Sequence, residues 1–280
     1  MIGLVRKKHL RSVLAASIGA VFATFAFAQR VTVLTPDGSS QSVAFAEQLV
    51  RAFEQKLRVT DTGVARSAFD SVKTEDPFNL TAEQARSIGT VIGCDYFVLV
   101  KAATARRSSS ARPAYYEAYA AIYLVNSRTG FLDQWTLESK QGETAAEAER
   151  SLFDTAPTVA NQLAAIVRGS KPEVNNGPEF ELFDPHSKTA RPTMPYKRIK
   201  PEYTSTAYMY EIAATVEAEL SVDDKGNIRR IDIVRWAGYG LDEAVISAIR
   251  QMNWRPGERG GKPLPMRVLL RYNFTKIEKE

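Results

Sequence analysis

Few residues in this 280-residue chain are of the types that carry acid–base or nucleophilic chemistry. The two histidines are His9, in a basic and apolar N-terminal segment, and His186, in a proline-rich stretch. A hydrolase that uses a histidine base therefore has no histidine in a predicted core. The single cysteine, Cys94, precedes an apolar strand, where a small buried hydrophobic residue is the ordinary interpretation. A lone cysteine also excludes an internal disulfide bond.

Metal and nucleotide sites have equally little support. Carboxylates are scattered along the chain rather than clustered with histidine or cysteine ligands. Asp223, Asp224 and Gly226 resemble part of a calcium loop, but the alternating oxygen ligands and the closing glutamate are missing, so a hairpin turn is predicted. The sequence holds neither a Gly-x-x-x-x-Gly-Lys-Ser/Thr loop nor a Gly-x-Ser-x-Gly elbow. We therefore expect no enzyme: no catalytic residue, no metal and no cofactor.

The N-terminal segment has the pattern of an export signal. Four cations and no acidic residue precede an apolar run over 13–27, which ends in Ala26-Phe27-Ala28. Small residues at that spacing fit the cleft of a signal peptidase, and the run is shorter than the roughly 20 apolar residues of a spanning helix. We predict that 1–28 is a signal peptide and that the mature chain, starting at Gln29, is periplasmic. The alternative is an uncleaved inner-membrane anchor.

The positive charge of the chain mostly comes from this segment. The formal net charge is +5, and the four cations of the segment account for all but +1 of it. No stripe of lysine and arginine runs along a predicted helix, so nucleic-acid binding is not indicated. One basic patch, 106–112, lies between two predicted strands. It is either a solvated hairpin tip or a contact for anionic lipid or glycan.

Hydrophobic periodicity over 29–168 predicts a periplasmic α/β domain with a mixed sheet and flanking helices. Thr81-Ala82-Glu83-Gln84 is a capping box, and the helix that it opens should end at Gly93. Tyr115, Tyr119 and Tyr123 share one face of a predicted strand, where they either stack a ligand or pack against a helix. The expected strands are 31–35, 58–60, 96–100, 115–125 and 131–138, and the expected helices are 46–57, 63–72, 82–92 and one from 145 to 167 that bends at Pro157.

A proline-rich linker is predicted at 169–194, where periodicity disappears. Its apolar residues, Phe180, Leu182 and Phe183, are candidates to dock on a neighbouring domain. Because this stretch offers so few apolar residues to a shared core, we expect the domains on either side to fold independently.

The final segment, 195–280, has the clearest pattern. Val216, Ala218, Leu220 and Val222 alternate with polar residues, and a turn follows at 223–226. A second strand near 228–236, a helix from 241 to 252 and a last alternating strand that ends at Phe274 complete the order strand, strand, helix, strand. The predicted fold class is therefore α+β: an α/β domain, a linker and a small ββαβ domain.

An ordered set of short motifs lies in this segment. It comprises Pro201 and Tyr203, Thr215-Val216-Glu217-Ala218-Glu219-Leu220, Asp224-Lys225-Gly226-Asn227-Ile228, Gly240-Leu241-Asp242, Trp254-Arg255-Pro256 and Gly261-Lys262-Pro263. Over about 195–276 the set resembles the C-terminal domain of the energy transducer TonB family. Thr204 and Ala214 depart from the proline and glycine that are common in the family.

The resemblance implies a non-catalytic cell-envelope protein, related to TonB-dependent transmembrane transport, that binds partner proteins. In the family the strand after the helix receives an extended peptide of the partner by strand addition. This assigns partner binding to the edge formed by Leu264, Met266, Arg267, Val268, Leu269, Leu270, Arg271, Tyr272 and Phe274. Arg267 and Arg271 would either attract an acidic peptide or discourage edge aggregation.

The partner implied is an outer-membrane receptor or an assembly component of the envelope. A genuine transducer, with 10–28 retained as its anchor, is the alternative, although transducers carry a long charged spacer where this chain has a folded domain. The passage from Asn79 to Val100 more loosely resembles the periplasmic α/β domains of the CsgG and TolB N-terminal type, which implies a role in assembly or protein binding.

Overall fold

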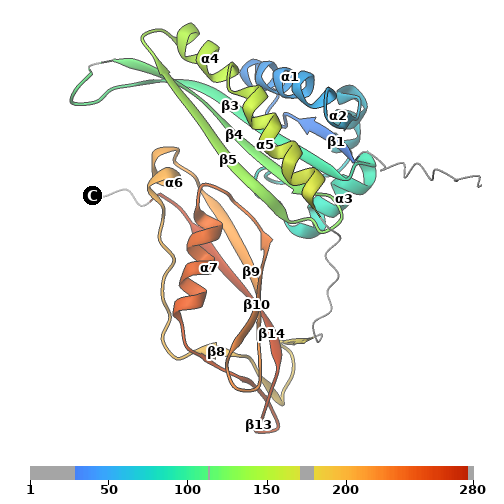
Figure 1. Ribbon diagram of the computed structural model, residues 1–280. Helices are drawn as coiled ribbons and strands as arrows, with labels where there is room; N and C mark the ends of the chain where they lie inside the picture. Colours follow the sequence, from blue (N-terminus) through green and yellow to red (C-terminus); the bar gives the residue numbers. More distant parts are fainter. Residues whose placement is uncertain (1–28, 113, 171–179, 277–280) are drawn as a thin grey trace, which may run out of the picture.

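The computed structural model describes residues 29–112, 114–170 and 180–276, and Figure 1 shows their arrangement. The predicted signal peptide therefore lies outside the described residues, as do linker residues 171–179.

A five-stranded mixed sheet, in the order β2-β1-β3-β4-β5, forms the N-terminal part. The strand β1 (Arg30–Leu34) pairs in parallel with both β2 (Arg58–Val59) and β3 (Tyr96–Arg107). The strands β4 (Tyr115–Asn126) and β5 (Leu132–Gly142) continue the sheet in antiparallel register. β1 and the first half of β3 are almost wholly apolar because both faces of the sheet are covered there.

Helices cover both faces of this sheet. On one face, α1 (Ser40–Glu54), α4 (Ala145–Phe153) and α5 (Ala156–Gly169) enclose one apolar cluster. On the other face, α2 (Thr62–Asp70) and α3 (Ala82–Ile92) contribute to a second cluster.

Local sequence explains where these helices begin and end. The Thr81 hydroxyl accepts the N–H of Gln84 at 3.1 Å, so the predicted capping box is present. Gly93 ends α3 with φ of 73°, a left-handed conformation that glycine adopts without strain. The predicted long helix from 145 is instead two helices, because Pro157 lies in the first turn of α5, where no N–H partner is needed.

A four-stranded sheet, in the order β10-β9-β14-β6, forms the C-terminal part. Its strands β9 (Ala214–Val222), β10 (Ile228–Arg235) and β14 (Met266–Phe274) are antiparallel, and α7 (Leu241–Gln251) packs its apolar side on one face. The order strand, strand, helix, strand and the predicted α+β class are confirmed.

Residues 180–201 run along this sheet rather than away from it. They contain β6 (Glu181–Leu182), β7 (Ala190–Arg191) and β8 (Met194–Pro195), which pair with β14, β12 and β11 respectively. We call 180–201 the strap. The remaining elements are α6 (Ser205–Met209), β11 (Trp254–Arg255), β12 (Gly257–Arg259) and β13 (Lys262–Leu264).

One apolar cluster continues from the N-terminal sheet into the C-terminal part. It contains Leu34, Phe97 and Tyr123 from the first sheet, together with Val216 and Trp236 from the second region. The C-terminal part thus shares the sheet face that α2 and α3 cover. This shared core was not predicted from the sequence. The domain limits near 169 and 195 stay a prediction.

Candidate functional site

The outer edge of β14 presents unpaired main-chain groups. The N–H of Phe183 donates to the carbonyl of Arg267 at 2.8 Å, so the main chain of Arg267 points away from β9. Because this direction alternates along a strand, the N–H and C=O of Leu269, Arg271 and Asn273 point to the same edge. Within the described residues, no strand pairs with this edge beyond Arg267. Leu269 is 50% exposed.

The strap covers the beginning of this edge. Glu181 and Leu182 pair in parallel with Met266 and Arg267, and the Glu181 carboxylate forms an ion pair with Arg259. Part of the apolar linker group therefore lies on the edge assigned to a partner. Leu264, placed by the prediction in the same edge strand, lies instead in β13 opposite Gly257, because Pro265 has no N–H to continue the ladder.

A groove of about 810 Å³ lies beside the free part of β14. Its walls are mainly apolar: Phe183 and Ile199 come from the strap, Trp254 from β11, and Leu270 and Tyr272 from β14. Three cations line the groove, namely Arg198, Lys200 and Arg271, and no described residue in its lining is acidic. An extended peptide on β14 would place alternate side chains in this groove.

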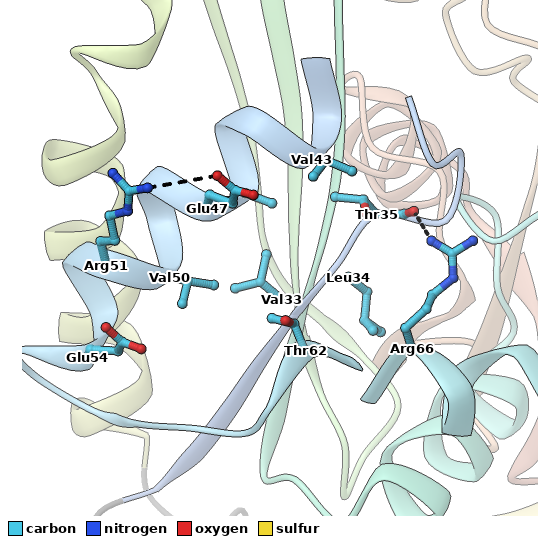
Figure 2. A pocket seen from close by; sticks show the side chains of 11 residues that line it. Val33, Leu34, Thr35, Val43, Glu47, Val50, Arg51, Glu54, Thr62 and Arg66 are labelled. Carbon is cyan, nitrogen blue, oxygen red and sulfur yellow. Dashed lines mark hydrogen bonds and ion pairs between the residues drawn. The ribbon is translucent and has the colours of Figure 1, made fainter. Parts of the chain in front are cut away.

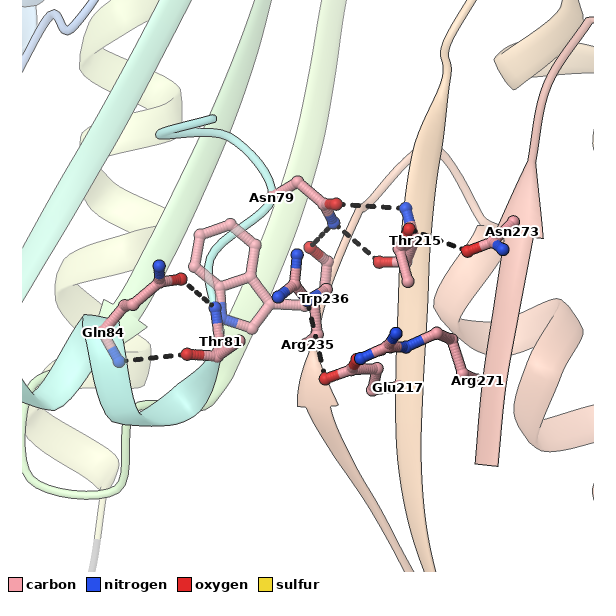
Figure 3. A network of polar contacts seen from close by, with 9 residues as sticks. All are labelled: Asn79, Thr81, Gln84, Thr215, Glu217, Arg235, Trp236, Arg271 and Asn273. Atoms are coloured by element: carbon pink, nitrogen blue, oxygen red, sulfur yellow. Dashed lines mark hydrogen bonds and ion pairs between the residues drawn. The ribbon is translucent and has the colours of Figure 1, made fainter. Parts of the chain in front are cut away.

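The arginines predicted to attract a partner are already paired. Arg271 donates through Nε to Glu217 at 2.7 Å, and Arg267 lies 3.1 Å from Glu219. Figure 3 shows Arg271 and Arg235 on either side of Glu217. Arg235 and Arg271 thus share the Glu217 carboxylate, while Glu219 pairs with Arg267.

Arg198 and Lys200 differ, because neither has an ion-pair or hydrogen-bond partner among the described residues. Burial raises the pKa of Tyr272, and the charge of Arg198 opposes that rise, so the guanidinium lies near the groove wall. Neither cation was predicted from the sequence to lie at this edge. Nothing in the local pattern shows that the strap folds back beside β14.

Asn79 joins the two parts of the chain, as Figure 3 shows. Its Nδ2 donates to the carbonyls of Thr215 at 2.8 Å and Trp236 at 2.7 Å, and its Oδ1 accepts the N–H of Thr215 at 3.0 Å. Asn79 is buried, and the capping box that follows it at Thr81 fixes the loop that carries it. The amide therefore satisfies three main-chain groups at the start of β9 and the end of β10.

Two of the three strand tyrosines, Tyr119 and Tyr123, pack on aromatic residues of the C-terminal part, whereas Tyr115 lies under the guanidinium of Arg112. Tyr119 lies 4.6 Å from Tyr210 between ring centroids, and Tyr123 lies 5.6 Å from Trp236. Gly238 permits a close approach nearby, because a Cβ there would lie 2.4 Å from the Trp135 ring.

Glu117 adds a buried polar contact to this interface. It accepts hydrogen bonds from Ser139 Oγ at 2.6 Å, Tyr210 Oη at 2.7 Å and Arg107 Nε at 2.8 Å. Burial opposes ionisation, but these three donors lower the pKa of Glu117. Arg107 of the predicted basic patch is therefore part of the interface, while 108–112 at the hairpin tip are exposed.

A second cavity, of about 290 Å³, lies between β1, α1 and α2 (Figure 2). Val33, Val43 and Val50 line it. Three of its four charged groups have partners: Glu47 and Arg51 are 3.9 Å apart, and Arg66 Nη1 donates to the carbonyl of Thr35 at 2.8 Å, while Glu54 is the fourth. We assign it no ligand.

Comparison with known proteins identifies the C-terminal part. Residues 199–275 match the family model described as Gram-negative bacterial TonB protein C-terminal, which confirms the resemblance inferred from the motifs. No curated protein matches the chain. Among the described residues, no helix is long and apolar enough to cross a membrane.

Several solved structures are similar to parts of the chain. The TonB C-terminal domain of Pseudomonas aeruginosa is 22% identical over 31% of this chain and 89% of its own, with a TM-score of 0.27. A lipoprotein from Neisseria meningitidis is 16% identical over 49% of this chain and 99% of its own, with a TM-score of 0.34. The LpoB C-terminal domain from Salmonella enterica is 16% identical over 41% of this chain and 84% of its own, with a TM-score of 0.27.

Proposed function

We propose that this chain is a non-catalytic cell-envelope protein that captures a partner by adding one of its strands to β14. The TonB C-terminal match fits a role in the cell envelope. One observation carries the proposal: Leu269, Arg271 and Asn273 direct their main-chain groups to an edge without a partner strand among the described residues, next to an apolar groove. Main-chain bonds would supply affinity, and side chains in the groove would supply selectivity.

The partner under this proposal is another envelope protein, either an outer-membrane receptor or an assembly component, and the setting is the periplasm. The alternative is a membrane-anchored transducer that drives receptor transport. The mass of the protein purified from the envelope separates the two, because a chain that starts at Gln29 has no anchor, whereas an anchored chain retains 13–27.

Leu269→Pro tests strand addition directly. Because the Leu269 N–H points outward, proline removes one donor to the partner and none to β9, so the fold should persist. Loss of a main-chain bond, with the steric effect of the ring, should weaken partner capture about tenfold. Leu269→Ala is the matched control, since it shortens the side chain and keeps the N–H.

The measurement is capture of envelope proteins by each variant, after circular dichroism confirms its fold. Hydrogen exchange of the β14 amides, with and without the captured protein, gives the site. Protection of Leu269, Arg271 and Asn273 on capture supports the proposal. Equal capture by Leu269→Pro and the control would show that β14 is not the binding edge.

A further inference from the structure

The N-terminal sheet has a free edge of its own, on β5. This strand is the last in the sheet order β2-β1-β3-β4-β5, and no strand of the described chain pairs with its outer side. The C-terminal part packs on a face of β5, where the Trp135 ring lies 4.8 Å from that of Tyr239, and not on the edge. An open strand edge of eleven residues is a template for pairing with another chain.

The hydrogen bonds of β4 show which residues of β5 face this edge. The N–H of Ser127 donates toward β3, to the carbonyl of Asp95 at 3.0 Å, and the ladder between β3 and β4 has no irregularity. Because the direction alternates, the even-numbered residues of β4 bond to β5, and they lie opposite even-numbered residues of β5 from 134 to 142. The odd-numbered residues therefore direct their main-chain groups outward, namely Leu137, Ser139 and Gln141.

One side chain already covers part of the edge. Gln134 Nε2 donates to the outward carbonyl of Trp135 at 2.7 Å. The segment 137–141 has no such cover among the described residues, and the side chains of Ser139 and Gln141 are exposed. The open part of the edge is therefore the end of β5 nearer the β3–β4 hairpin tip.

Two opposite charges lie on one face of this open segment. Glu138 and Lys140 are half-buried and lie opposite Ala120 and Ala118 of β4. Neither forms a side-chain hydrogen bond or an ion pair within the part of the chain that the structure describes. Each therefore lacks the counter-charge that a neighbouring strand could supply.

A second copy of β5 supplies both counter-charges at once. When two β5 strands pair antiparallel about a two-fold axis at Ser139, Leu137 lies opposite Gln141 of the other copy and Glu138 lies opposite its Lys140. The outward groups of 137, 139 and 141 form the hydrogen-bonded pairs. The two pairs of Glu138 with Lys140 take the non-hydrogen-bonded positions, where side chains are closest.

Charge also specifies this register. An axis at Glu138 would place that carboxylate opposite its own copy, and an axis at Lys140 would do the same for the ammonium. Shifts by half a residue would set outward main-chain groups against inward ones, so no ladder could form. The axis at Ser139 satisfies both the hydrogen-bond direction and the charges.

We propose that this chain forms a two-fold dimer in which the β5 edges of two copies pair over 137–141 and Glu138 of each copy faces Lys140 of the other. The pairing is independent of the strand addition proposed for β14 and does not use that edge. A dimer therefore carries two β14 edges, so a partner with two suitable segments would gain avidity.

Charge reversal tests the dimer on the mature chain. Glu138→Lys and Lys140→Glu each replace both opposite-charge pairs with like-charge pairs, and each should raise the Kd of the dimer about tenfold or more. An equimolar mixture of the two variants should dimerise again, because every cross-strand pair of the mixed dimer joins opposite charges. Glu138→Lys/Lys140→Glu should dimerise like the unmodified protein. Sedimentation velocity over a concentration series measures each Kd.

A main-chain variant and two controls complete the set. Gln141→Pro removes an outward N–H and none that bonds to β4, so it should weaken the dimer, whereas Gln141→Ala keeps the N–H and should not. Lys73→Glu, at an exposed position outside β5, controls for the change in net charge. Circular dichroism confirms the fold of each variant.

The outcomes separate the two edges. A dimer that Gln141→Pro weakens and Leu269→Pro leaves unchanged supports pairing through β5. The reverse pattern would place self-association at β14 and overturn the proposal, as would an unmodified protein that stays monomeric throughout the series. Single charge variants that dimerise as tightly as the unmodified protein would also overturn it. None of these results bears on partner capture by β14, which the capture experiment tests separately.

Discussion

Asp242 shows how one side chain supports the contact between the two parts of the chain. Its carboxylate accepts the N–H of Ala237 at 2.9 Å and of Gly238 at 2.8 Å, and so fixes the turn that packs on Trp135. Its place in the first turn of the helix was predicted, but its burial was not. Burial raises the pKa of Asp242 to about 7, although the two N–H donors oppose the rise.

This pKa predicts a pH dependence of stability. The folded state holds the proton more tightly than the unfolded state, where the pKa is 3.8. Protonated Asp242 therefore contributes fully to the free energy of unfolding below pH 3.8. This contribution, at most about 4 kcal/mol, is lost as the pH rises to about 7. We expect the free energy of unfolding to fall between pH 4.5 and about 7.5 more in the unmodified protein than in Asp242→Asn.

Urea unfolding across that range measures the difference. Glu243→Gln is the control, because Glu243 is the exposed neighbour on the same helix turn. Parallel pH profiles for the unmodified protein and Asp242→Asn would show that the backbone donors keep the carboxyl ionised.

For single residues, the sequence predicts which of them belong to a regular helix or strand. It does not predict contacts between residues that lie far apart in the chain. Alternation placed Leu269 and Arg271 in a strand, and the resemblance to the TonB family assigned the edge of that strand to a partner. Arg198 and Lys200 lie in a stretch without periodicity, so their position beside β14 depends on tertiary pairing that has no local pattern. Asn79 was visible as a residue before a capping box, but its partners lie more than a hundred residues away.

Among the elements, β6 decides how much of the β14 edge is open. The N–H of Phe183, directly after β6, donates to the carbonyl of Arg267 and so keeps β6 on this edge. Phe183→Pro removes that donor and should release β6 from the edge, whereas Phe183→Ala keeps the N–H and removes the same aromatic contact with the groove. We expect faster amide hydrogen exchange at Arg267 in the proline variant than in the alanine variant, since β6 covers that amide.

Release of β6 should also strengthen peptide binding. The free edge would then extend from Leu269 back to Arg267, and one more ladder contact favours the complex about threefold or more. Fluorescence anisotropy with a labelled heptapeptide of alternating serine and valine compares the two variants. Unchanged exchange at Arg267 in Phe183→Pro would mean that β6 is held by other contacts, such as the ion pair between Glu181 and Arg259.

Element prediction succeeded where the pattern is long and failed where it is short. The nine-residue strands β9 and β14 and the eleven-residue α7 each repeat their period several times, so the ββαβ order could be inferred. The strands β6, β7 and β8 have two residues each, too few for any period. They form because β14, β12 and β11 offer edges, and the strap is long enough to reach them.

For the whole molecule, the main difference from the sequence analysis is the shared core. Trp236 is fully buried, packs on Tyr123 and donates through Nε1 to the carbonyl of Gly130 at 3.2 Å. The apolar residues that join the two parts lie on strand and loop faces far apart in the chain and not in the linker. Independent folding was expected because the linker has few apolar residues, but the interface between the two parts is formed by other residues.

Cleaving the chain between its two parts tests what the interface contributes. A specific protease site inserted within 171–179 would cut the connection and leave the described elements intact. Because both fragments bury apolar surface and aromatic rings against each other, we expect them to elute together in gel filtration after cleavage.

Asn79→Ala should weaken this association, since it leaves three buried main-chain groups without their partner, at a cost of about 2–4 kcal/mol. Asn253→Ala, at an exposed asparagine, is the control. Two folded fragments that separate from the unmodified protein would show that the interface adds little, and that each part folds on its own, as the linker composition predicted. Joint elution that Asn79→Ala abolishes would mean that a peptide on β14 is held at a fixed position relative to the N-terminal sheet.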